Sequence, residues 1–384
     1  MRPFIRKLSE AVSSVRSALL KAAEPKFTDL QQTREYGSTF KSWPKSSAKD
    51  GIGHSIFKPT AKVAAAHGAR KYSTQLELPP ELSEKIYEHF LTLKAIGKPR
   101  IVMSESTLEK AAKSVIDFLE NGATTNEKFA KFLEGLGNFS RDPENTAMII
   151  GGLPIKGEKD TILAAYIVQI LASVLNHKPF IDKIIKNCEA VDSEINHRAL
   201  LPHCDQPLSR PHLSIIALTT LESGERKIGT LLFECDEIYK KLTTLTKEIL
   251  HSVDFKCTSI KSGDDDWFKI FSFDENQSLK IDFDADTSDL TYKRKDCKFS
   301  HDEVRLAILE LSNTIFYCAS EELGGEVGQI LYIKNHRALH GRKELDLNSQ
   351  RLLLKQFFEP KTSIEHRDHT TKLSESRQPS LIIE

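Results

Sequence analysis

The sequence predicts a mainly β fold with flanking helices, built on a double-stranded β-helix, or jelly roll. Two observations favour this class. Helical periodicity dominates residues 79–136, and short apolar runs of strand length alternate with polar turns from residue 148 to residue 358. An insertion at about residues 234–300, in which short strand-like runs alternate with acidic turns, interrupts the strands. Strands divided by one insertion fit a jelly roll wrapped by helices.

The individual elements follow from local patterns. Helices are predicted at residues 79–93, 107–121, 126–136, 160–176, 235–249 and 301–318. Strands are predicted at residues 148–155, 213–218, 229–233, 280–286, 329–334 and 351–358. Pro79 and Pro80 suit a first helical turn, and Gly122 suits the position just after a helix end. We expect the first three helices to buttress one face of the sheet, without a chemical role.

The predicted domain covers residues 76–360, between a basic, mostly flexible extension at residues 1–75 and a flexible tail at residues 361–384. The extension has fourteen lysines and arginines against five acidic residues, and its start places apolar side chains at helical spacing. This composition is typical of a mitochondrial presequence. It also fits a basic tail whose first helix packs on the domain or on a partner. We favour the tail, because a presequence spanning the whole extension would be long.

The bulk composition argues against several classes of partner. Lysine plus arginine equals aspartate plus glutamate at 54 each, so no overall basic field favours nucleic acid. The longest apolar stretch, residues 162–175, contains Gln169 and is too short to span a bilayer. The six cysteines form no C-x-x-C pair and indicate reduced thiols of an intracellular protein. We therefore expect a cytoplasmic protein that binds a small molecule, with the mitochondrial matrix as the alternative location.

Two short motifs carry the predicted chemistry. In Leu201-Pro-His-Cys-Asp205, side chains two residues apart on a strand share a face, so His203 and Asp205 can reach one object about 6.6 Å of strand apart. An imidazole and a carboxylate placed in this way are good ligands for a first-row divalent metal. A second histidine completes the facial triad of non-haem Fe(II) oxygenases. His340 is the best candidate, because it too ends an apolar, strand-like run, the one at residues 328–333.

Two further residues suit a carboxylate ligand beside such a metal. Arg351 lies eleven residues after His340, on the next predicted strand, where its planar guanidinium could bind a carboxylate through two hydrogen bonds. Thr230 lies 27 residues after His203 and could donate its hydroxyl to the same carboxylate.

This pattern resembles the Fe(II)- and 2-oxoglutarate-dependent dioxygenases of the taurine dioxygenase and clavaminate synthase superfamily. The resemblance covers about residues 78–360 and is most specific in Asn335-His-Arg-Ala-Leu-His-Gly-Arg342 and in the two offsets. It implies His203, Asp205 and His340 as iron ligands. It also implies that Arg351 and Thr230 hold the distal carboxylate of 2-oxoglutarate, and that part of residues 234–300 forms a lid over the substrate.

Features of two branches are mixed in the sequence. The segment Met148-Ile-Ile-Gly-Gly-Leu-Pro154 resembles the Leu-Pro strand of the clavaminate synthase branch, which includes amino-acid hydroxylases, and so does the block at residues 279–286. Asp205, where that branch usually has glutamate, and the early position of Arg351 look more like taurine dioxygenase. The mixture leaves the substrate class open.

The resemblance implies a hydroxylase that needs Fe(II), 2-oxoglutarate and O₂, and that releases succinate and CO₂. Two residues near the predicted ligands have alternative interpretations. Arg342 either orients the C1 carboxylate of 2-oxoglutarate or braces its loop. Cys204, between two ligands, is either a redox switch on the iron or, as we favour, a small buried apolar residue.

The predicted substrate is a small amino acid or amine with a basic side chain. Asp282, Asp284 and Asp286 alternate along one predicted strand and would therefore face the same side. In the amino-acid hydroxylases that the sequence resembles, acidic residues of this region help to hold a cationic side chain. The alternative is that these aspartates protect a solvated edge strand from aggregation.

Other classes of function remain open. A zinc hydrolase could use the same three ligands but would not need Arg351 or Thr230 at those offsets. A non-catalytic jelly-roll binding protein would need no intact triad, and a degenerate relative would have lost a ligand. An oxygenase of an acidic or sulfonated molecule, like taurine dioxygenase, is the alternative closest to the favoured one.

Overall fold

The structure is a computed structural model. It describes residues 73–95, 103–186, 199–205, 213–224, 227–257, 267–274, 276–285, 290–295, 297–318, 320–345 and 351–361. The predicted extension before residue 73 and the tail after residue 361 lie outside the described residues. No helix in the described ranges is long and apolar enough to cross a membrane.

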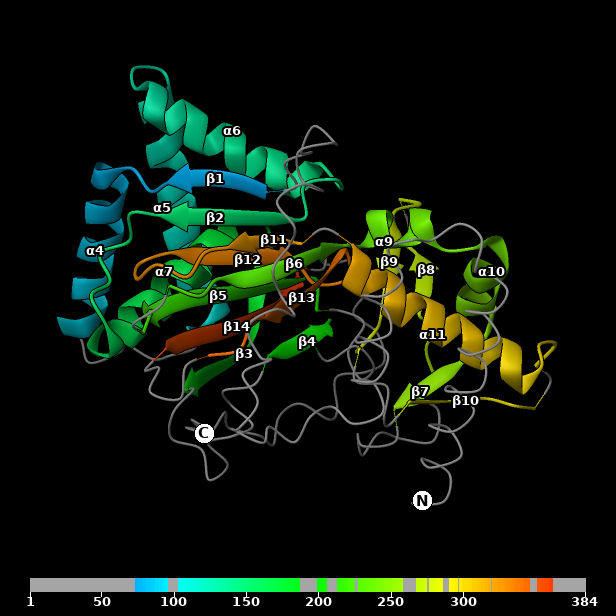
Figure 1. The fold of residues 1–384 in the computed structure, drawn as a ribbon. Coiled ribbons are helices and arrows are strands. Elements are labelled where there is room, and N and C mark those ends of the chain that lie inside the picture. Colours follow the sequence, from blue (N-terminus) through cyan, green and yellow to red (C-terminus); the bar gives the residue numbers. More distant parts are fainter. Residues whose placement is uncertain are drawn as a thin grey trace, which may run out of the picture. The chain divides into compact units, whose positions relative to one another are not determined.

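Two sheets form the centre of the molecule, which confirms the prediction of a mainly β fold with flanking helices (Figure 1). The larger sheet has the order β1-β2-β12-β5-β14-β3 and the smaller sheet the order β11-β6-β13-β4. The larger sheet consists of β1 (Ser73–Glu77), β2 (Ala147–Gly151), β12 (Ile330–Lys334), β5 (Ile215–Glu222), β14 (Leu352–Pro360) and β3 (His177–Lys186). The smaller sheet consists of β11 (Glu321–Leu323), β6 (Thr230–Glu234), β13 (Ala338–Arg342) and β4 (Leu200–His203).

The central strands of the larger sheet, β2, β12, β5 and β14, are buried on both faces, which explains why they are mostly apolar. Along β2, Met148 and Ile150 join the core with the helices, whereas Ala147 and Ile149 join a second core that lies between the two sheets. This alternation is the two-residue period of a strand. The second core contains Leu232 of the smaller sheet, so the two sheets pack with their inner faces together.

Four helices cover the outer face of the larger sheet. They are α4 (Pro80–Ala95), α5 (Glu105–Ala123), α6 (Glu127–Arg141) and α7 (Thr161–Val174). All four lie within a few residues of the predicted helices, and Asn126 caps α6 by accepting a hydrogen bond from the Lys128 backbone N–H. The hydroxyl of Tyr332 on β12 donates to the Val168 carbonyl of α7 at 3.0 Å, which fixes this helix on the sheet.

The segment between β6 and β11 forms a separate group of elements beside the two sheets (Figure 1). It contains α9 (Cys235–Lys241), α10 (Thr244–Ser252), β7 (Phe255–Cys257), β8 (Phe271–Phe273), β9 (Leu279–Ile281), β10 (Leu290–Tyr292) and α11 (His301–Tyr317). The single helix predicted at 235–249 is wrong, because Thr243 caps a new helix by accepting from the Thr246 backbone N–H. α11 begins as predicted, with a capping box between Ser300 and Glu303.

Several predicted boundaries are wrong. β1 begins at Ser73, inside the predicted extension, and pairs in parallel with β2. β3 was not predicted, although nine of its ten residues pair along β14. The strand predicted at 280–286 ends at Ile281, and the segment after it has one isolated bridge, between His203 and Asp284.

Candidate metal centre

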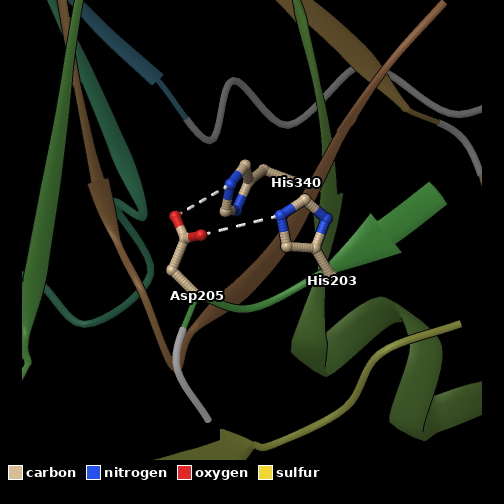
Figure 2. A group of neighbouring side chains, drawn as sticks. All are labelled: His203, Asp205 and His340. Atoms are coloured by element: carbon tan, nitrogen blue, oxygen red, sulfur yellow. Dashed lines mark ion pairs between the residues drawn. The ribbon is translucent and has the colours of Figure 1, made fainter. Parts of the chain in front are cut away.

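The smaller sheet brings the three predicted ligands together. His203 ends β4, Asp205 follows two residues later, and His340 lies on the neighbouring strand directly opposite His203. The Asp205 carboxylate is 3.7 Å from Nε2 of His203 through Oδ1 and 3.2 Å from Nε2 of His340 through Oδ2 (Figure 2). One ligand atom from each residue lies within 4.8 Å of the other two, which is a spacing suitable for a single metal ion.

Contrary to the prediction, His340 does not end the apolar run at residues 328–333 but lies on a separate strand. That run is β12, which ends at Lys334, and a turn leads into the separate strand β13. Gly341 lets β13 approach β4, because a Cβ at this position would lie 2.7 Å from the Leu200 carbonyl oxygen. The glycine next to His340 is therefore required by the close pairing of the two ligand-bearing strands.

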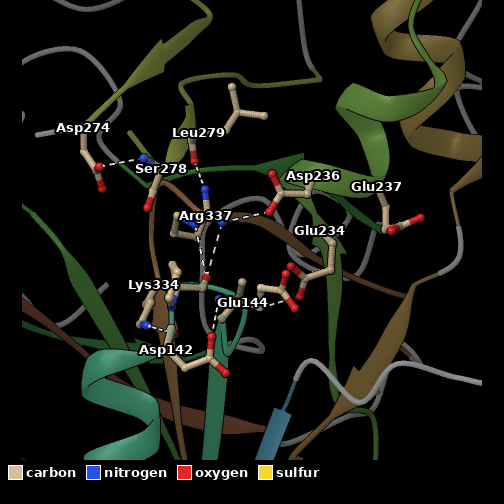
Figure 3. A network of polar contacts seen from close by, with 12 residues as sticks. Asp142, Glu144, Glu234, Asp236, Glu237, Asp274, Ser278, Leu279, Lys334 and Arg337 are labelled. Carbon is tan, nitrogen blue, oxygen red and sulfur yellow. Dashed lines mark hydrogen bonds and ion pairs between the residues drawn. The ribbon is translucent and has the colours of Figure 1, made fainter. Parts of the chain in front are cut away.

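Polar contacts of the turn before β13 fix the positions of the ligands. The Asn335 side chain accepts from the Asp205 backbone N–H at 2.9 Å and donates to the Asp205 carbonyl at 3.0 Å. Arg337 donates to the Leu279 carbonyl and lies 2.8 Å from Asp236 (Figure 3). Asn335 thus holds the backbone of a ligand, whereas Arg337 ties the turn to the inserted segment.

The charges of the triad suit a metal ligand set. The Nδ1–H of His203 donates to the Leu201 carbonyl at 2.7 Å, which leaves the Nε2 lone pair directed toward the centre. Burial, followed by the nearby His203, lowers the pKa of His340 to about 4, so this imidazole is neutral. Burial by itself would raise the pKa of Asp205, but the Lys355 ammonium holds it well below its usual range.

Thr230 and Arg351 line one small cavity, together with apolar side chains such as Leu218, Leu331 and Leu353. The Arg351 side chain is 3% exposed, and its Nε has no hydrogen-bond partner among the described residues. Burial, with a smaller effect of the nearby Arg342, lowers the pKa of Arg351 to about 10, so its guanidinium stays charged. A buried, charged guanidinium whose Nε has no hydrogen-bond partner among the described residues is suited to bind an anionic ligand.

Arg342 is buried on β13, but it is not among the residues that line this cavity. Burial lowers the pKa of Arg342 to about 10. Its contribution in the structure is a positive charge close to Arg351.

Lys355 contacts the predicted metal ligand Asp205 directly, which the sequence pattern did not predict. Its ammonium forms an ion pair with Oδ2 of Asp205, and the residue is only 8% exposed. The signal was present in the sequence, because Lys355 lies four residues after Arg351 and interrupts a strand of leucines and phenylalanines. Strand periodicity places two residues four apart on the same face, here the face that meets the smaller sheet.

The three aspartates predicted to hold the substrate do not form one row. Asp282 lies 2.7 Å from Nδ1 of His336, and Asp284 is exposed and opposite His203. Asp286 lies outside the described residues. The expected alternation fails because β9 ends before Asp282.

Comparisons with known proteins agree with this fold. No protein-family model and no curated protein matches the sequence, whereas solved structures of non-haem iron oxygenases match its fold. The asparagine oxygenase complex with Fe(II), 3-hydroxyasparagine and succinate has 14% identity and a TM-score of 0.56, covering 76% of this chain and 94% of that chain. Complexes of the oxygenase OrfP with Fe and L-Arg and with Fe and alpha-ketoglutaric acid have 15% and 16% identity and a TM-score of 0.54 each, covering 75% of this chain and 94% of those chains.

This chain therefore has the fold of the non-haem iron oxygenases, which confirms the resemblance predicted from the sequence at the level of the fold. OrfP and asparagine oxygenase are among the solved structures it is similar to.

Proposed function

We propose that this protein is an Fe(II)- and 2-oxoglutarate-dependent oxygenase that hydroxylates an unactivated C–H bond of a small molecule. The observation that carries the proposal is the convergence of His203, Asp205 and His340, and it is supported by the buried Arg351, whose Nε has no hydrogen-bond partner among the described residues. We infer also that the two facing sheets are the halves of a jelly roll. The donor set fits iron, because two imidazoles and one carboxylate on one side leave the other coordination positions open.

Each residue of the site has a defined part in this proposal. His203, Asp205 and His340 would hold the iron, and Arg351 with Thr230 would bind the distal carboxylate of 2-oxoglutarate at the end of the cavity. Iron with 2-oxoglutarate and O₂ supplies the oxidative decarboxylation to succinate and CO₂ and the C–H hydroxylation. The chain itself supplies position and a dry surrounding, because the ligands and the cavity lie between two packed sheets.

Lys355 favours a substrate that carries an anionic group. Its ammonium occupies the same Asp205 oxygen that approaches His340, so a metal at the triad would compete with it for that oxygen. A carboxylate of the substrate is a suitable replacement partner for a buried ammonium. Together with the arginine and asparagine derivatives bound by the similar oxygenases, this supports an amino acid as substrate.

A basic side chain on that amino acid stays our preferred prediction. Its structural support is now Asp284, which lies opposite His203, because Asp282 is paired with His336. The alternative is an acidic or sulfonated small molecule, for which Lys355 alone would suffice.

An anaerobic titration tests the class of enzyme. Adding 2-oxoglutarate to the protein with Fe(II) under nitrogen should produce a weak visible charge-transfer band, which requires the keto acid to chelate iron. A zinc hydrolase or a non-catalytic binding protein would give no such band. Absence of the band in folded protein with one bound iron would refute the proposal.

The substrate class is tested by a panel of free amino acids, amines and sulfonates, scored for succinate release above the uncoupled background. Basic amino acids should stimulate release most. Stimulation by sulfonates or acidic molecules alone would select the taurine dioxygenase-like alternative.

A further inference from the structure

A second cluster of potential metal ligands lies on the opposite side of the strand that carries the first two ligands. Sγ of Cys204, a carboxylate oxygen of Asp282 and a ring nitrogen of His336 lie within 4.8 Å of one another. Cys204 is 2% exposed and His336 is 7% exposed, whereas Asp282 is partly buried. None of these residues belongs to the triad or to the cavity of Arg351.

His336 lacks the hydrogen bonds that a buried histidine normally makes with neighbouring residues, within the part of the chain that the structure describes. Its Nδ1 is 2.7 Å from Oδ1 of Asp282, but neither ring nitrogen has a hydrogen-bond partner within the described ranges. A buried imidazole left without a partner costs free energy comparable to a lost hydrogen bond. An ordinary histidine–aspartate pair would place a ring N–H in line with the carboxylate. The close approach without such a bond leaves the His336 ring available to a cation, whose binding would move Nδ1 and Oδ1 slightly apart, because two ligands at about 2.0 Å from a tetrahedral zinc lie about 3.3 Å apart.

The polar neighbours of the Cys204 sulfur are the Phe283 backbone and Oδ1 of Asp282, 3.9 Å away. The Phe283 backbone N–H is directed at Sγ at 3.1 Å, and the Cys204 backbone N–H donates to the Phe283 carbonyl at 3.0 Å. An N–H directed at sulfur stabilises negative charge on it. The Phe283 carbonyl oxygen lies 3.5 Å from Sγ and is near enough to complete, or to share with water, a fourth coordination position.

We propose that Cys204, Asp282 and His336 form a second metal site that binds zinc. One thiolate and one carboxylate offset the two charges of the ion, so the loaded site is neutral in a buried position. Binding converts the Cys204 thiol to a thiolate with release of one proton to solvent, and no oxidant or reductant takes part. Thiolate and imidazole ligands select zinc over the hard cations magnesium and calcium, and zinc binds such sites more tightly than Fe(II).

The second site would join three segments that position the triad. Cys204 lies between His203 and Asp205, and His336 lies in the turn that leads to His340. Asp282 directly follows β9. The last residue of β9, Ile281, donates its backbone N–H to the His336 carbonyl. Zinc would therefore connect the end of β4 to the start of β13, on the side of these strands that faces away from the triad. The proposal does not depend on the oxygenase function, because the two sites share no ligand.

Cobalt(II) is the probe that separates the two sites. Cobalt bound to a thiolate shows charge-transfer absorption in the near ultraviolet, whereas cobalt bound only to imidazole and carboxylate does not. Metal-free full-length protein should bind two Co(II) per chain, and the thiolate band should saturate with one of them. No thiolate band in the wild-type protein would overturn the proposal.

His336→Ala and His340→Ala are matched variants, because both remove a buried histidine. His336 lies in the turn before β13, and His340 lies on β13. His336→Ala should lose one Co(II) and the thiolate band. His340→Ala should lose the other Co(II) and keep the band. The reverse pattern, or a band retained in both variants, would refute the assignment. Cys235→Ala removes another fully buried cysteine and should keep the band.

A measurement on the wild-type chain covers the case in which His336→Ala does not fold. X-ray absorption at the zinc edge, on protein loaded with one equivalent of zinc, should show one sulfur ligand at about 2.3 Å. Zinc with nitrogen and oxygen ligands only would mean that it occupies the triad instead, and would overturn the second site.

Discussion

The two sheets bury different kinds of side chain. The central strands of the larger sheet present mostly apolar residues to both faces, as Met148 and Ile149 do on neighbouring positions of β2, and bury few polar residues, such as Thr219 and Thr220 of β5. The smaller sheet buries His340, Thr230 and Glu234. Burying polar groups lowers stability unless they are paired, whereas burying apolar area raises it. The apolar burial of the larger sheet therefore offsets the free energy that it costs to bury the polar groups of the candidate metal centre in the smaller sheet.

β14 is the exception that connects the two. Its residue Phe358 belongs to the core under the helices, yet Lys355 on the same strand reaches Asp205. Arg351, immediately before the strand, lines the cavity with Thr230. The comparison thus predicts that the effect of a substitution depends on the sheet and on the face that it touches.

The largest expected effect is on activity, from the triad. His203→Ala, Asp205→Ala and His340→Ala should each abolish 2-oxoglutarate turnover, because all three ligands are needed for the facial site. Each variant should remain folded, because no triad residue belongs to either apolar core. Succinate release and circular dichroism measure the two properties. Full turnover in any one variant would exclude that residue as a ligand.

The second largest effect is on stability, from the larger sheet. Phe358→Ala removes a fully buried ring and should lower the free energy of unfolding by about 3–5 kcal/mol. Phe273→Ala, on a ring that is 52% exposed, is the control and should change it by about 0.5 kcal/mol. Urea unfolding measures both. Equal effects would mean that the larger sheet is not the main source of stability.

The third prediction concerns pH and a polar group of the smaller sheet. Burial, opposed by a hydrogen bond from Thr146, raises the pKa of Glu234 from 4.5 to about 8. Between these values the folded state keeps a proton that the unfolded state has lost, so this group makes stability fall as pH rises from 4.5 to 8. Glu234→Gln removes the titration and should raise stability at pH 8 by about 2–3 kcal/mol.

Thermal unfolding at a series of pH values checks this prediction. The wild-type protein should lose more stability between pH 5 and pH 8 than Glu234→Gln does. Glu88→Gln changes an exposed glutamate on α4 and serves as the control. Identical pH profiles of the Glu234 variant and the wild-type protein would show that Glu234 is ionised in the folded state.

The contrast between the sheets also explains what the sequence could predict. The helices, most strands of the larger sheet and the triad follow from local signals: periodicity, caps, and the i, i+2 spacing of His203 and Asp205. β3 and β13 were missed because pairing with distant strands decides them. His340 was assigned to the wrong strand because the turn at Asn335–Arg337 is held by tertiary contacts, such as that of Arg337 with Asp236. The row of aspartates failed for the same reason, since Asp282 turns toward His336.

The smallest predicted effect concerns the residue that joins the two sheets functionally. Arg351→Lys keeps the positive charge but loses the planar fork that can bind a carboxylate through two parallel hydrogen bonds. KM for 2-oxoglutarate should rise roughly tenfold, which corresponds to about 1–2 kcal/mol. The rate at saturating 2-oxoglutarate should change less, because the triad is untouched. Arg141→Lys, on the exposed end of α6, is the matched control and should leave KM unchanged. An unchanged KM in Arg351→Lys would move the carboxylate anchor to another cation, and Lys355 is then the first to test because it faces the same inner space.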